Sequence, residues 1–260
     1  FWKMKKVVIF GGSGFLGSYV ADELTQREYD VLIADVKESM YLKKKQSFIH
    51  CDIMISENVV DALNGASIVY NFAGLADIDQ SIHQSKTTME QNVIGNINIL
   101  EACKEINIER FIYASSAYAF SDKGSFYGIS KLASEKIIEE YEKRYNLPYS
   151  IVRYGSLYGE RADEHNGMYR ILRSAVETGQ IIHRGTGEEM REYIHAADAA
   201  KMSVDIIEKM DFMNEHIILT GVEKLRHKDL LQMIQEILNN NVTVSYSGEP
   251  WEGHFQVTPY

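Results

Sequence analysis

Short apolar runs alternate with stretches of helical periodicity along the first 155 residues. The short runs predict buried strands, and apolar residues that recur every three or four positions predict helices packed on one face. The predicted strands are 6–10, 30–35, 47–50, 67–72, 110–114 and 149–154, and the predicted helices lie near 15–27, 56–63, 85–106 and 126–145. Alternation of this kind implies an α/β fold, a doubly wound parallel sheet with helices on both faces.

A glycine-rich turn joins the first predicted strand to the first predicted helix. Residues 11–17 read Gly-Gly-Ser-Gly-Phe-Leu-Gly, which fits both G-x-G-x-x-G and G-x-x-G-x-x-G. Strand, glycine turn and helix N-terminus together form a pyrophosphate site, because amide N–H groups point outward and glycine lets the ligand approach the backbone. The turn therefore predicts a Rossmann-type dinucleotide site, with the cofactor against Gly11, Gly14, Phe15, Leu16 and Gly17.

An acidic residue follows at the distance that this kind of site requires. The second predicted strand ends in Asp35, which lies 18 residues after Gly17. A carboxylate there accepts hydrogen bonds from the adenosine ribose and repels a 2′-phosphate, so the predicted cofactor is NAD rather than NADP. Lys37, two residues on, is the one feature that would favour NADP.

The later strands end in residues that suit a ligand at the carboxyl edge of the sheet. Asp52, next to Ile53, is predicted to accept from the adenine amino group, and the alternative is a helix cap together with Ser56. Small or flat residues after the fourth strand would let the cofactor lie against the backbone, and hydroxyls after the fifth would lie near the nicotinamide. These further cofactor residues are Phe72, Ala73, Gly74, Ser115 and Ser116, with Asn92 from the helix between them.

Tyr127 and Lys131 open the helix that follows the fifth strand. Their i, i+4 spacing puts both side chains on one helix face, where they would meet Ser116 over the nicotinamide. A second Y-x-x-x-K, at Tyr41 and Lys45, stands in a lysine run and is interpreted as accidental. The alternative for the first pair is a half-buried tyrosine with a snorkelling lysine.

Composition narrows the class of protein. The net charge of −10 argues against nucleic acid as a partner, because binding phosphates requires a basic face. Cys51 and Cys103 are too few for a disulfide framework or a zinc site, so no metal is predicted. The sequence contains neither a membrane-length apolar run nor a signal peptide, which by elimination predicts a cytoplasmic protein. Met4 is the expected natural start, after Phe1, Trp2 and Lys3.

In this order the motifs resemble the extended short-chain dehydrogenase/reductase superfamily, in its branch of nucleotide-sugar epimerases and dehydratases, over nearly the whole chain. The resemblance implies catalytic roles for Ser116, Tyr127 and Lys131 and adds three residues. Tyr154 is an expected cofactor contact and Ser156 an expected substrate contact. Both belong to Arg153-Tyr-Gly-Ser156, the segment that leads from an NAD-binding core, 4–155, to a smaller substrate-binding subdomain, mainly 156–260. Arg191 resembles the arginine that binds the substrate diphosphate; the alternative is a surface ion pair with Glu188 or Glu189. The segment 190–220 is expected to cross back into the NAD-binding core.

Three departures from the family pattern stand out. Ser156 replaces a usual asparagine, and only 11 residues separate Ser116 from Tyr127, so a loop near the substrate is shortened. The chain stops at Thr258-Pro-Tyr260, where the family normally continues into further helices of the substrate subdomain.

The resemblance also implies a homodimer in which the helices near 85–106 and 126–145 pair across a two-fold axis.

The expected reaction depends on the two residues after Ser116. Tyr127 would take the proton of a sugar hydroxyl, with its pKa lowered by Lys131 and the nicotinamide charge. Dehydratases of the family have an acidic pair after the Ser/Thr, where this chain has Ala117 and Tyr118. This favours 4-epimerisation of a nucleotide sugar such as UDP-glucose. The alternatives are a dehydrogenase or reductase, a dehydratase, and a dinucleotide-binding sensor without catalysis. Tyr118 is either a substrate contact or packing.

Overall fold

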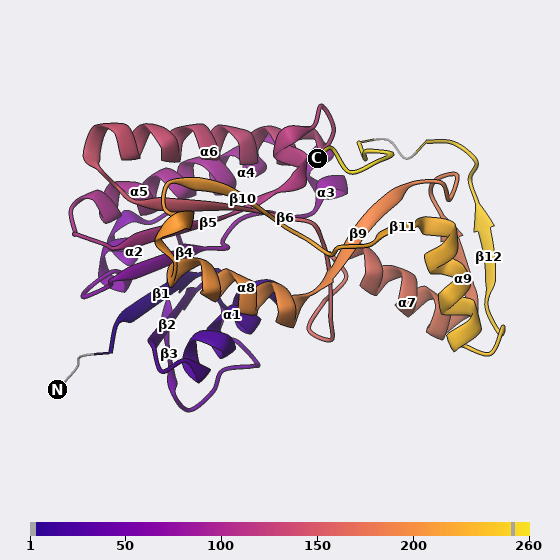
Figure 1. Cartoon of the computed structure of the whole chain (residues 1–260), viewed down its shortest axis with the longest axis horizontal. Coiled ribbons are helices and arrows are strands. Elements are labelled where there is room, and N and C mark those ends of the chain that lie inside the picture. Colours follow the sequence, from indigo (N-terminus) through magenta and orange to yellow (C-terminus); the bar gives the residue numbers. More distant parts are fainter. Residues whose placement is uncertain (1–3, 251–252) are drawn as a thin grey trace.

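The computed structural model describes residues 4–250 and 253–260; the three residues before the expected start at Met4 lie outside this range. Within it, seven parallel strands form the central sheet, in the order β3-β2-β1-β4-β5-β6-β10 (Figure 1). These strands are β1 (Lys6–Phe10), β2 (Asp30–Asp35), β3 (Gln46–His50), β4 (Ile68–Asn71), β5 (Arg110–Ser116), β6 (Tyr149–Tyr154) and β10 (Glu215–Leu219). The predicted α/β fold with a doubly wound parallel sheet is confirmed.

Helices cover both faces of this sheet because each presents one apolar stripe to it. On one face lie α1 (Phe15–Gln26) and α8 (Ala196–Ile207), and on the other α2 (Ser56–Ala62), α5 (Gly95–Lys104) and α6 (Ser125–Tyr145). In α1 the stripe is Leu16, Val20 and Leu24, all nearly inaccessible to solvent. Burying each such side chain stabilises the fold by about 1.5–3 kcal/mol.

The helix predicted over 85–106 is interrupted in its first half. Two short helices, α3 (Ile78–His83) and α4 (Ser85–Met89), lead into a π-helical turn over Glu90–Ile94, which continues directly into α5. Such turns are often found at functional sites. This one contains Asn92.

A smaller lobe is built from the second half of the chain (right in Figure 1). Leu231, Ile234, Ile181 and Ala175 lie in its separate core. Its elements are β7 (Ser156–Tyr158), α7 (Gly167–Thr178), β8 (Gln180–His183), β9 (Met190–His195), β11 (Lys224–Arg226), α9 (His227–Ile237) and β12 (Thr243–Tyr246). Between β9 and β11 the chain returns to the larger lobe, where α8 packs beside α1 and β10 extends the sheet beside β6.

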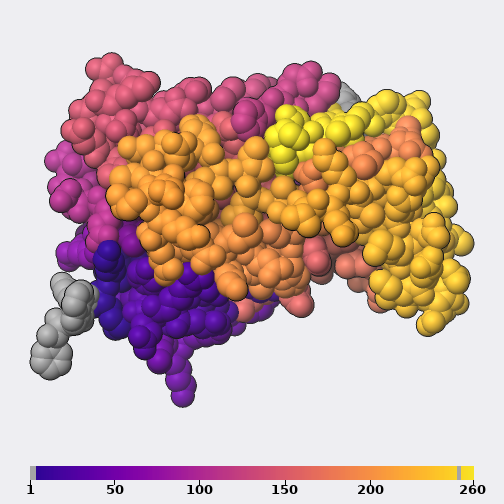
Figure 2. All heavy atoms as spheres, in the orientation of Figure 1, coloured from indigo at the N-terminus to yellow at the C-terminus, as the bar shows by residue number. Residues whose placement is uncertain are grey.

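The end of the chain runs back from β12 to the larger lobe. Figure 2 shows these last residues, in yellow, against the pink atoms of the α6 region. Two backbone hydrogen bonds join this segment to the two lobes. The Gly124 N–H of the larger lobe donates to Gly253 O, and the Met190 N–H of the smaller lobe donates to Gln256 O. In the part of the chain that the structure describes, no helix has the length and apolarity to cross a membrane.

Candidate functional site

The glycine turn is so tightly packed that two of its positions exclude a side chain. Gly11 has φ +72°, and a Cβ there would lie 2.5 Å from the Ala73 nitrogen. A Cβ on Gly17 would lie 2.4 Å from the Gly11 oxygen, so α1 can approach β1 only with glycine at this position. The turn therefore brings the start of α1 to the carboxyl edge of β1 and β4.

The N-terminus of α1 is suited to an anion. Its N-cap residue, the exposed Gly14, has extended backbone, no side chain of the described residues caps the helix, and its first turn contains no acidic residue. The N–H groups of the first turn, which begins with Phe15, Leu16 and Gly17, therefore have no capping partner, and the helix dipole adds positive potential. This geometry fits the pyrophosphate of a dinucleotide.

Asp35 lies at the end of β2, directly beside the glycine turn. One of its carboxylate oxygens accepts from the Ser13 N–H at 3.0 Å, while the Ser13 hydroxyl donates to the Lys37 carbonyl. The Asp35 carboxylate is therefore held in place and keeps acceptor capacity for the two hydroxyls of a ribose.

We predict that Asp35→Ala weakens NAD binding by roughly five-fold and raises the affinity for NADP relative to NAD, because one good hydrogen bond is worth about 1 kcal/mol and the repulsion of a 2′-phosphate disappears. Titration with both cofactors measures the ratio. Asp35→Asn separates the two effects, since it keeps an acceptor for Ser13 but removes the charge. Asp30→Ala, at the exposed start of the same strand, is the control. Tighter binding of NADP by the wild type would contradict the role of Asp35.

Asp52 and Ile53 follow β3, at the same edge of the sheet. The Asp52 carboxylate accepts from the Met54 N–H at 2.9 Å, and the Ile53 carbonyl accepts from the Asn98 amide. The alternative of a helix cap is wrong: α2 begins after Ile55, and no side chain of the described residues caps it. Contact of Asp52 with adenine stays a prediction.

The loop after β4 is fixed from beneath by Asn92. The Asn92 Oδ1 accepts from Leu75 N–H at 2.7 Å, and its amide donates to the Leu75 carbonyl and to Ser130. Gly74 has φ +140°, and a Cβ there would lie 2.4 Å from the same Oδ1. Both amide hydrogens of Asn92 are thus engaged within the protein, so it positions the loop. The loop residues next to it, Phe72 and Ala73, stay predicted cofactor contacts.

The structure brings together the three predicted catalytic residues. Ser116 ends β5, and Tyr127 and Lys131 occupy successive turns at the start of α6. The Lys131 ammonium donates to the Ala114 carbonyl at 2.8 Å and lies 5.7 Å from the centre of the Tyr127 ring. All three side chains are more than nine-tenths buried.

Burial is the largest influence on the pKa values of Tyr127 and Lys131. Loss of solvent raises the pKa of Tyr127, and a hydrogen bond with Ser116 opposes the rise. Loss of solvent also lowers the pKa of Lys131 to about 8, against the attraction of Glu135. In the protein alone the pKa of Tyr127 is therefore raised, not lowered as expected, because loss of solvent outweighs the hydrogen bond with Ser116. A bound cation such as the nicotinamide ring would favour the phenolate.

Ser115 does not share the position of Ser116. Successive side chains of a strand point to opposite faces, and the Ser115 hydroxyl donates to the Glu135 carboxylate at 2.5 Å. Of the two hydroxyls, only that of Ser116 interacts with the Tyr127 phenol, and contact of Ser115 with the cofactor stays a prediction.

Glu135 itself is the centre of a buried network that the sequence reasoning missed. Arg153 binds both of its oxygens, at 2.8 and 2.5 Å. Burial would raise the pKa of Glu135, but the hydrogen bonds from Arg153, His216 and Ser115 lower it to about 2. Tyr127, Lys131 and Glu135 stand at positions i, i+4 and i+8 of one helix, which places them on the same face. This spacing is the sequence signal that could have indicated Glu135.

A small cavity of about 40 Å³ opens beside Ser116. It brings together residues from strand ends of the larger lobe, from β9 and from the last residues of the chain. Its lining is Ser116, Ala117, Tyr118, Tyr154, Gly155, Ser156, Glu192, Phe255, Thr258 and Tyr260. Three of the four predicted substrate residues are among them. Tyr154 contributes its ring only, because its hydroxyl is bonded to Ser203 at 2.6 Å.

Tyr118 and Arg191 are both covered by the end of the chain. The Tyr118 hydroxyl lies 2.9 Å from His254 Nδ1, and its ring centre is 4.4 Å from that of Phe255. The Arg191 guanidinium stacks 4.3 Å above the same Phe255 ring. The alternative for Arg191, a surface ion pair with Glu188 or Glu189, is wrong. The Arg191 side chain is buried, Glu188 pairs with Lys228, and Glu189 pairs with His183.

Glu192 is a further residue that the sequence reasoning missed. It is 6% exposed, lines the cavity, and its Oε2 has no hydrogen-bond partner among the described residues. A buried acceptor of this kind is costly unless a ligand donates to it. No local pattern indicates this role, because Glu192 lies on β9, far in sequence from Ser116.

A doubly wound parallel sheet, an uncapped helix after a glycine turn and a buried Ser-Tyr-Lys group are together typical of a dinucleotide-dependent enzyme. Residues 7–220 match the NAD dependent epimerase/dehydratase family, and the chain belongs to that family. This confirms the predicted membership and the prediction of an NAD-dependent enzyme. NAD, the cofactor of the family, fits the glycine turn described above.

Individual relatives are distant. The chain is 28% identical over 220 residues to a putative UDP-glucose 4-epimerase of Methanocaldococcus jannaschii, covering 76% of this chain and 72% of the relative. A dTDP-D-glucose 4,6-dehydratase of Dictyostelium discoideum is 24% identical, covering 85% and 59%. The fold is shared with UDP-glucuronic acid 4-epimerase from Bacillus cereus, solved with UDP-glucuronic acid and NAD, at a TM-score of 0.90, 23% identity and coverage of 97% and 89%.

Proposed function

We propose that this protein is a nucleotide-sugar 4-epimerase that acts through a transient 4-keto sugar. The observation that carries the proposal is that the two residues after Ser116 are Ala117 and Tyr118, neither of which is acidic. Ala117 is buried, and the Tyr118 hydroxyl lies against His254. Dehydratases of the branch that this chain resembles use an acidic residue at these positions to eliminate water, and neither residue here can supply that acid. The names of the relatives support a UDP-sugar, and UDP-glucose/UDP-galactose is the first pair to test.

Each member of the Ser-Tyr-Lys group has one task in this reaction. Tyr127 takes the proton of the sugar hydroxyl and later returns it, and Ser116 hydrogen-bonds the same oxygen and orients it. Lys131, held on the Ala114 carbonyl, keeps a positive charge near the phenol. NAD, when bound, supplies the hydride acceptor and donor. Arg191, close to the cavity through Phe255, is the proposed ligand of the diphosphate, and Ser156 lines the sugar side.

One observation favours a second candidate, elimination of water. Glu192 places a carboxylate in the same cavity, although from β9 rather than from the segment after Ser116. In an epimerase this side chain serves as an acceptor for a sugar hydroxyl. In a dehydratase it would have to be the acid. The two roles can be separated by Glu192→Gln, which keeps the shape and removes the proton-transferring group.

We predict that UDP-glucose tritiated at C4 gives UDP-galactose that retains the label, with no NADH released. An epimerase returns the hydride that it removed, so its cofactor is regenerated in every turnover. The measurement is the tritium content of the separated sugars together with absorbance of NADH. In Glu192→Gln the epimer should still form, at a lower rate.

Three other outcomes would contradict the proposal. NADH equimolar with a keto product indicates a dehydrogenase. A product lighter by one water, lost in Glu192→Gln, indicates a dehydratase. Tight NAD binding with no turnover of any nucleotide sugar indicates a binding protein without catalysis.

We also infer a homodimer. The helices α4, α5 and α6 lie side by side (Figure 1). Apolar side chains are exposed on α6 and on the π-helical turn between α4 and α5, among them Ile129, Leu132 and Ile94, at 56%, 42% and 46%. An exposed apolar face on neighbouring helices supports association of two copies. Light scattering should give a mass of about twice 29.7 kDa; the mass of a single chain would contradict the dimer. The cytoplasmic location stays a prediction.

A further inference from the structure

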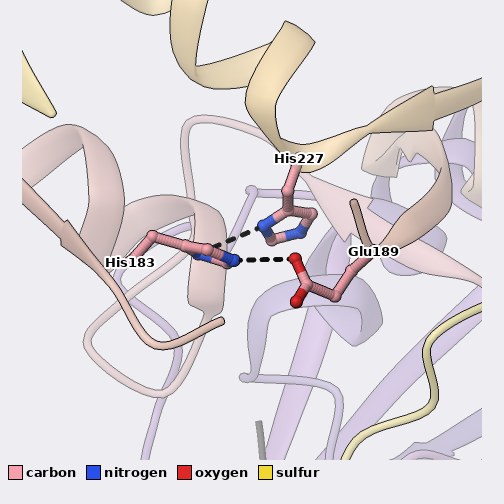
Figure 3. Close-up of side chains that lie close together, drawn as sticks. All are labelled: His183, Glu189 and His227. Atoms are coloured by element: carbon pink, nitrogen blue, oxygen red, sulfur yellow. Dashed lines mark hydrogen bonds and ion pairs between the residues drawn. The ribbon is translucent and has the colours of Figure 1, made fainter. Parts of the chain in front are cut away.

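Two histidines and a glutamate converge inside the smaller lobe, away from the Ser116 cavity. Figure 3 shows His183 at the end of β8, Glu189 just before β9 and His227 at the start of α9 pointing toward one another. They are 4%, 0% and 5% exposed. None of them lines the cavity beside Ser116. The proposed function gives this cluster no task.

The distances within the cluster suit a common ligand. The His183 and His227 Nδ1 atoms lie 3.4 Å apart, and one ligand atom from each of the three residues falls within 4.8 Å of the others. Two nitrogens bound tetrahedrally to one zinc ion at about 2.0–2.1 Å lie about 3.3 Å apart. The two imidazoles are therefore already at ligand spacing. The Glu189 carboxylate lies 2.9 Å from the other ring nitrogen of His183, Nε2, so it has to leave this partner and move toward the two Nδ1 atoms to become the third ligand.

Hydrogen bonds from neighbouring groups fix the orientation of two members of the cluster. The Tyr193 hydroxyl lies 2.9 Å from His227 Nε2, which leaves Nδ1 facing the cluster. The Glu189 carboxylate accepts from the N–H groups of Thr186 and Gly187, at 2.8 and 2.9 Å. Metal ligands typically have such outer partners, which fix their orientation.

Gly185 lies directly beside the cluster. A Cβ on Gly185 would lie 2.4 Å from Glu189 Oε1 and 2.6 Å from His183 Nε2. Any side chain at position 185 would therefore collide with two of the three residues.

We propose that His183, Glu189 and His227 form a site for a divalent transition-metal ion, with zinc the best match to two nitrogens and one carboxylate oxygen. Three protein ligands leave one tetrahedral position for a solvent molecule. The ion would tie β8, the turn before β9 and α9 together. Because β9 also carries Arg191 and Glu192, the site would stabilise the strand that borders the substrate cavity.

The test uses the full chain without a histidine tag, stripped with a chelator and titrated with Zn²⁺ against a chromophoric chelator. We expect one equivalent of tightly bound zinc in the wild type and a loss of affinity of about 100-fold or more in His183→Ala and His227→Ala. His50→Ala, which removes an exposed histidine of the larger lobe, is the matched control and should bind as the wild type does. Zinc should also raise the melting temperature of the wild type and of His50→Ala only.

A second measurement does not require any variant to fold. Co²⁺ added to the stripped wild type should give the intense visible absorption of a tetrahedral site, which Zn²⁺ then removes. Absence of a stoichiometric site, or equal zinc affinity in wild type and His227→Ala, would overturn the proposal. The cluster would then be a chain of hydrogen bonds from Glu189 through both histidines to Tyr193. Neither result depends on whether the protein epimerises a sugar.

Discussion

Tyr127→Phe should lower turnover by about 100-fold or more while NAD stays bound. The substitution removes the one hydroxyl that can exchange a proton with the sugar and keeps the ring that fills the buried site, and general acid–base groups typically contribute this much to the rate. Initial rates of epimer formation and a cofactor titration on the same preparation measure the two properties separately.

Tyr113→Phe is the matched control. Tyr113 is also a buried tyrosine beside Lys131, whose ammonium lies 4.9 Å from its ring centre, and its hydroxyl has no hydrogen-bond partner in the described part of the chain. Loss of that hydroxyl should leave turnover within a few-fold of the wild type. Full activity in Tyr127→Phe, or equal losses in the two variants, would remove Tyr127 from the mechanism.

Glu135→Gln should destabilise the fold by about 3–5 kcal/mol, because it leaves the Arg153 guanidinium buried without its counter-charge. Arg153 donates to both Glu135 oxygens, and both side chains are buried. For a chain of this size the melting temperature should fall by on the order of 10 °C. Glu139→Gln is the control, since Glu139 lies one turn further along α6 and pairs with the exposed Lys136. A melting temperature in Glu135→Gln equal to that of the control would contradict this prediction.

The same pair predicts how stability depends on pH. The pKa of Glu135 is about 2 in the folded protein, below its value of about 4.3 in an unfolded chain. The folded state therefore binds fewer protons in this window, and the contribution of Glu135 is complete above about pH 4.3 and lost as the pH falls toward 2. Denaturant unfolding from pH 6 to pH 2.5 should show a steeper loss in the wild type than in Glu135→Gln. Equal slopes would contradict the assignment.

The parts of the fold that sequence could predict are those fixed by local pattern. The strand predicted over 6–10 and the helix predicted near 15–27 appear as Lys6–Phe10 and Phe15–Gln26, because apolar runs and glycines encode them within a few residues. The Tyr127 and Lys131 pair could be found for the same reason, since i, i+4 spacing on a helix is local. NAD was predictable because the site for its pyrophosphate is one continuous segment.

The features that could not be predicted depend on contacts between distant parts of the chain. Phe255 covers Tyr118 across more than a hundred residues, and no pattern near either residue indicates the contact. Glu192 reaches the Ser116 cavity only because β9 pairs with β7. The spacing of His183, Glu189 and His227 matches no common metal motif, which explains why the expectation of no metal was drawn from the cysteines alone. The pKa of Tyr127 depends on burial, which a sequence does not give.

The π-helical turn at Glu90–Ile94 sets the direction in which Asn92 points from the helix axis. It accommodates one residue more than an α-turn, and the carbonyl of Asn92 accepts from the Ser134 hydroxyl while its side chain binds Leu75 and Ser130. Each residue advances an α-helix by about 100°, so a chain one residue shorter here would rotate Asn92 away from either the loop or α6. The alignment of α6, which carries Lys131, with the loop after β4 thus depends on the number of residues in this turn as well as on their identity.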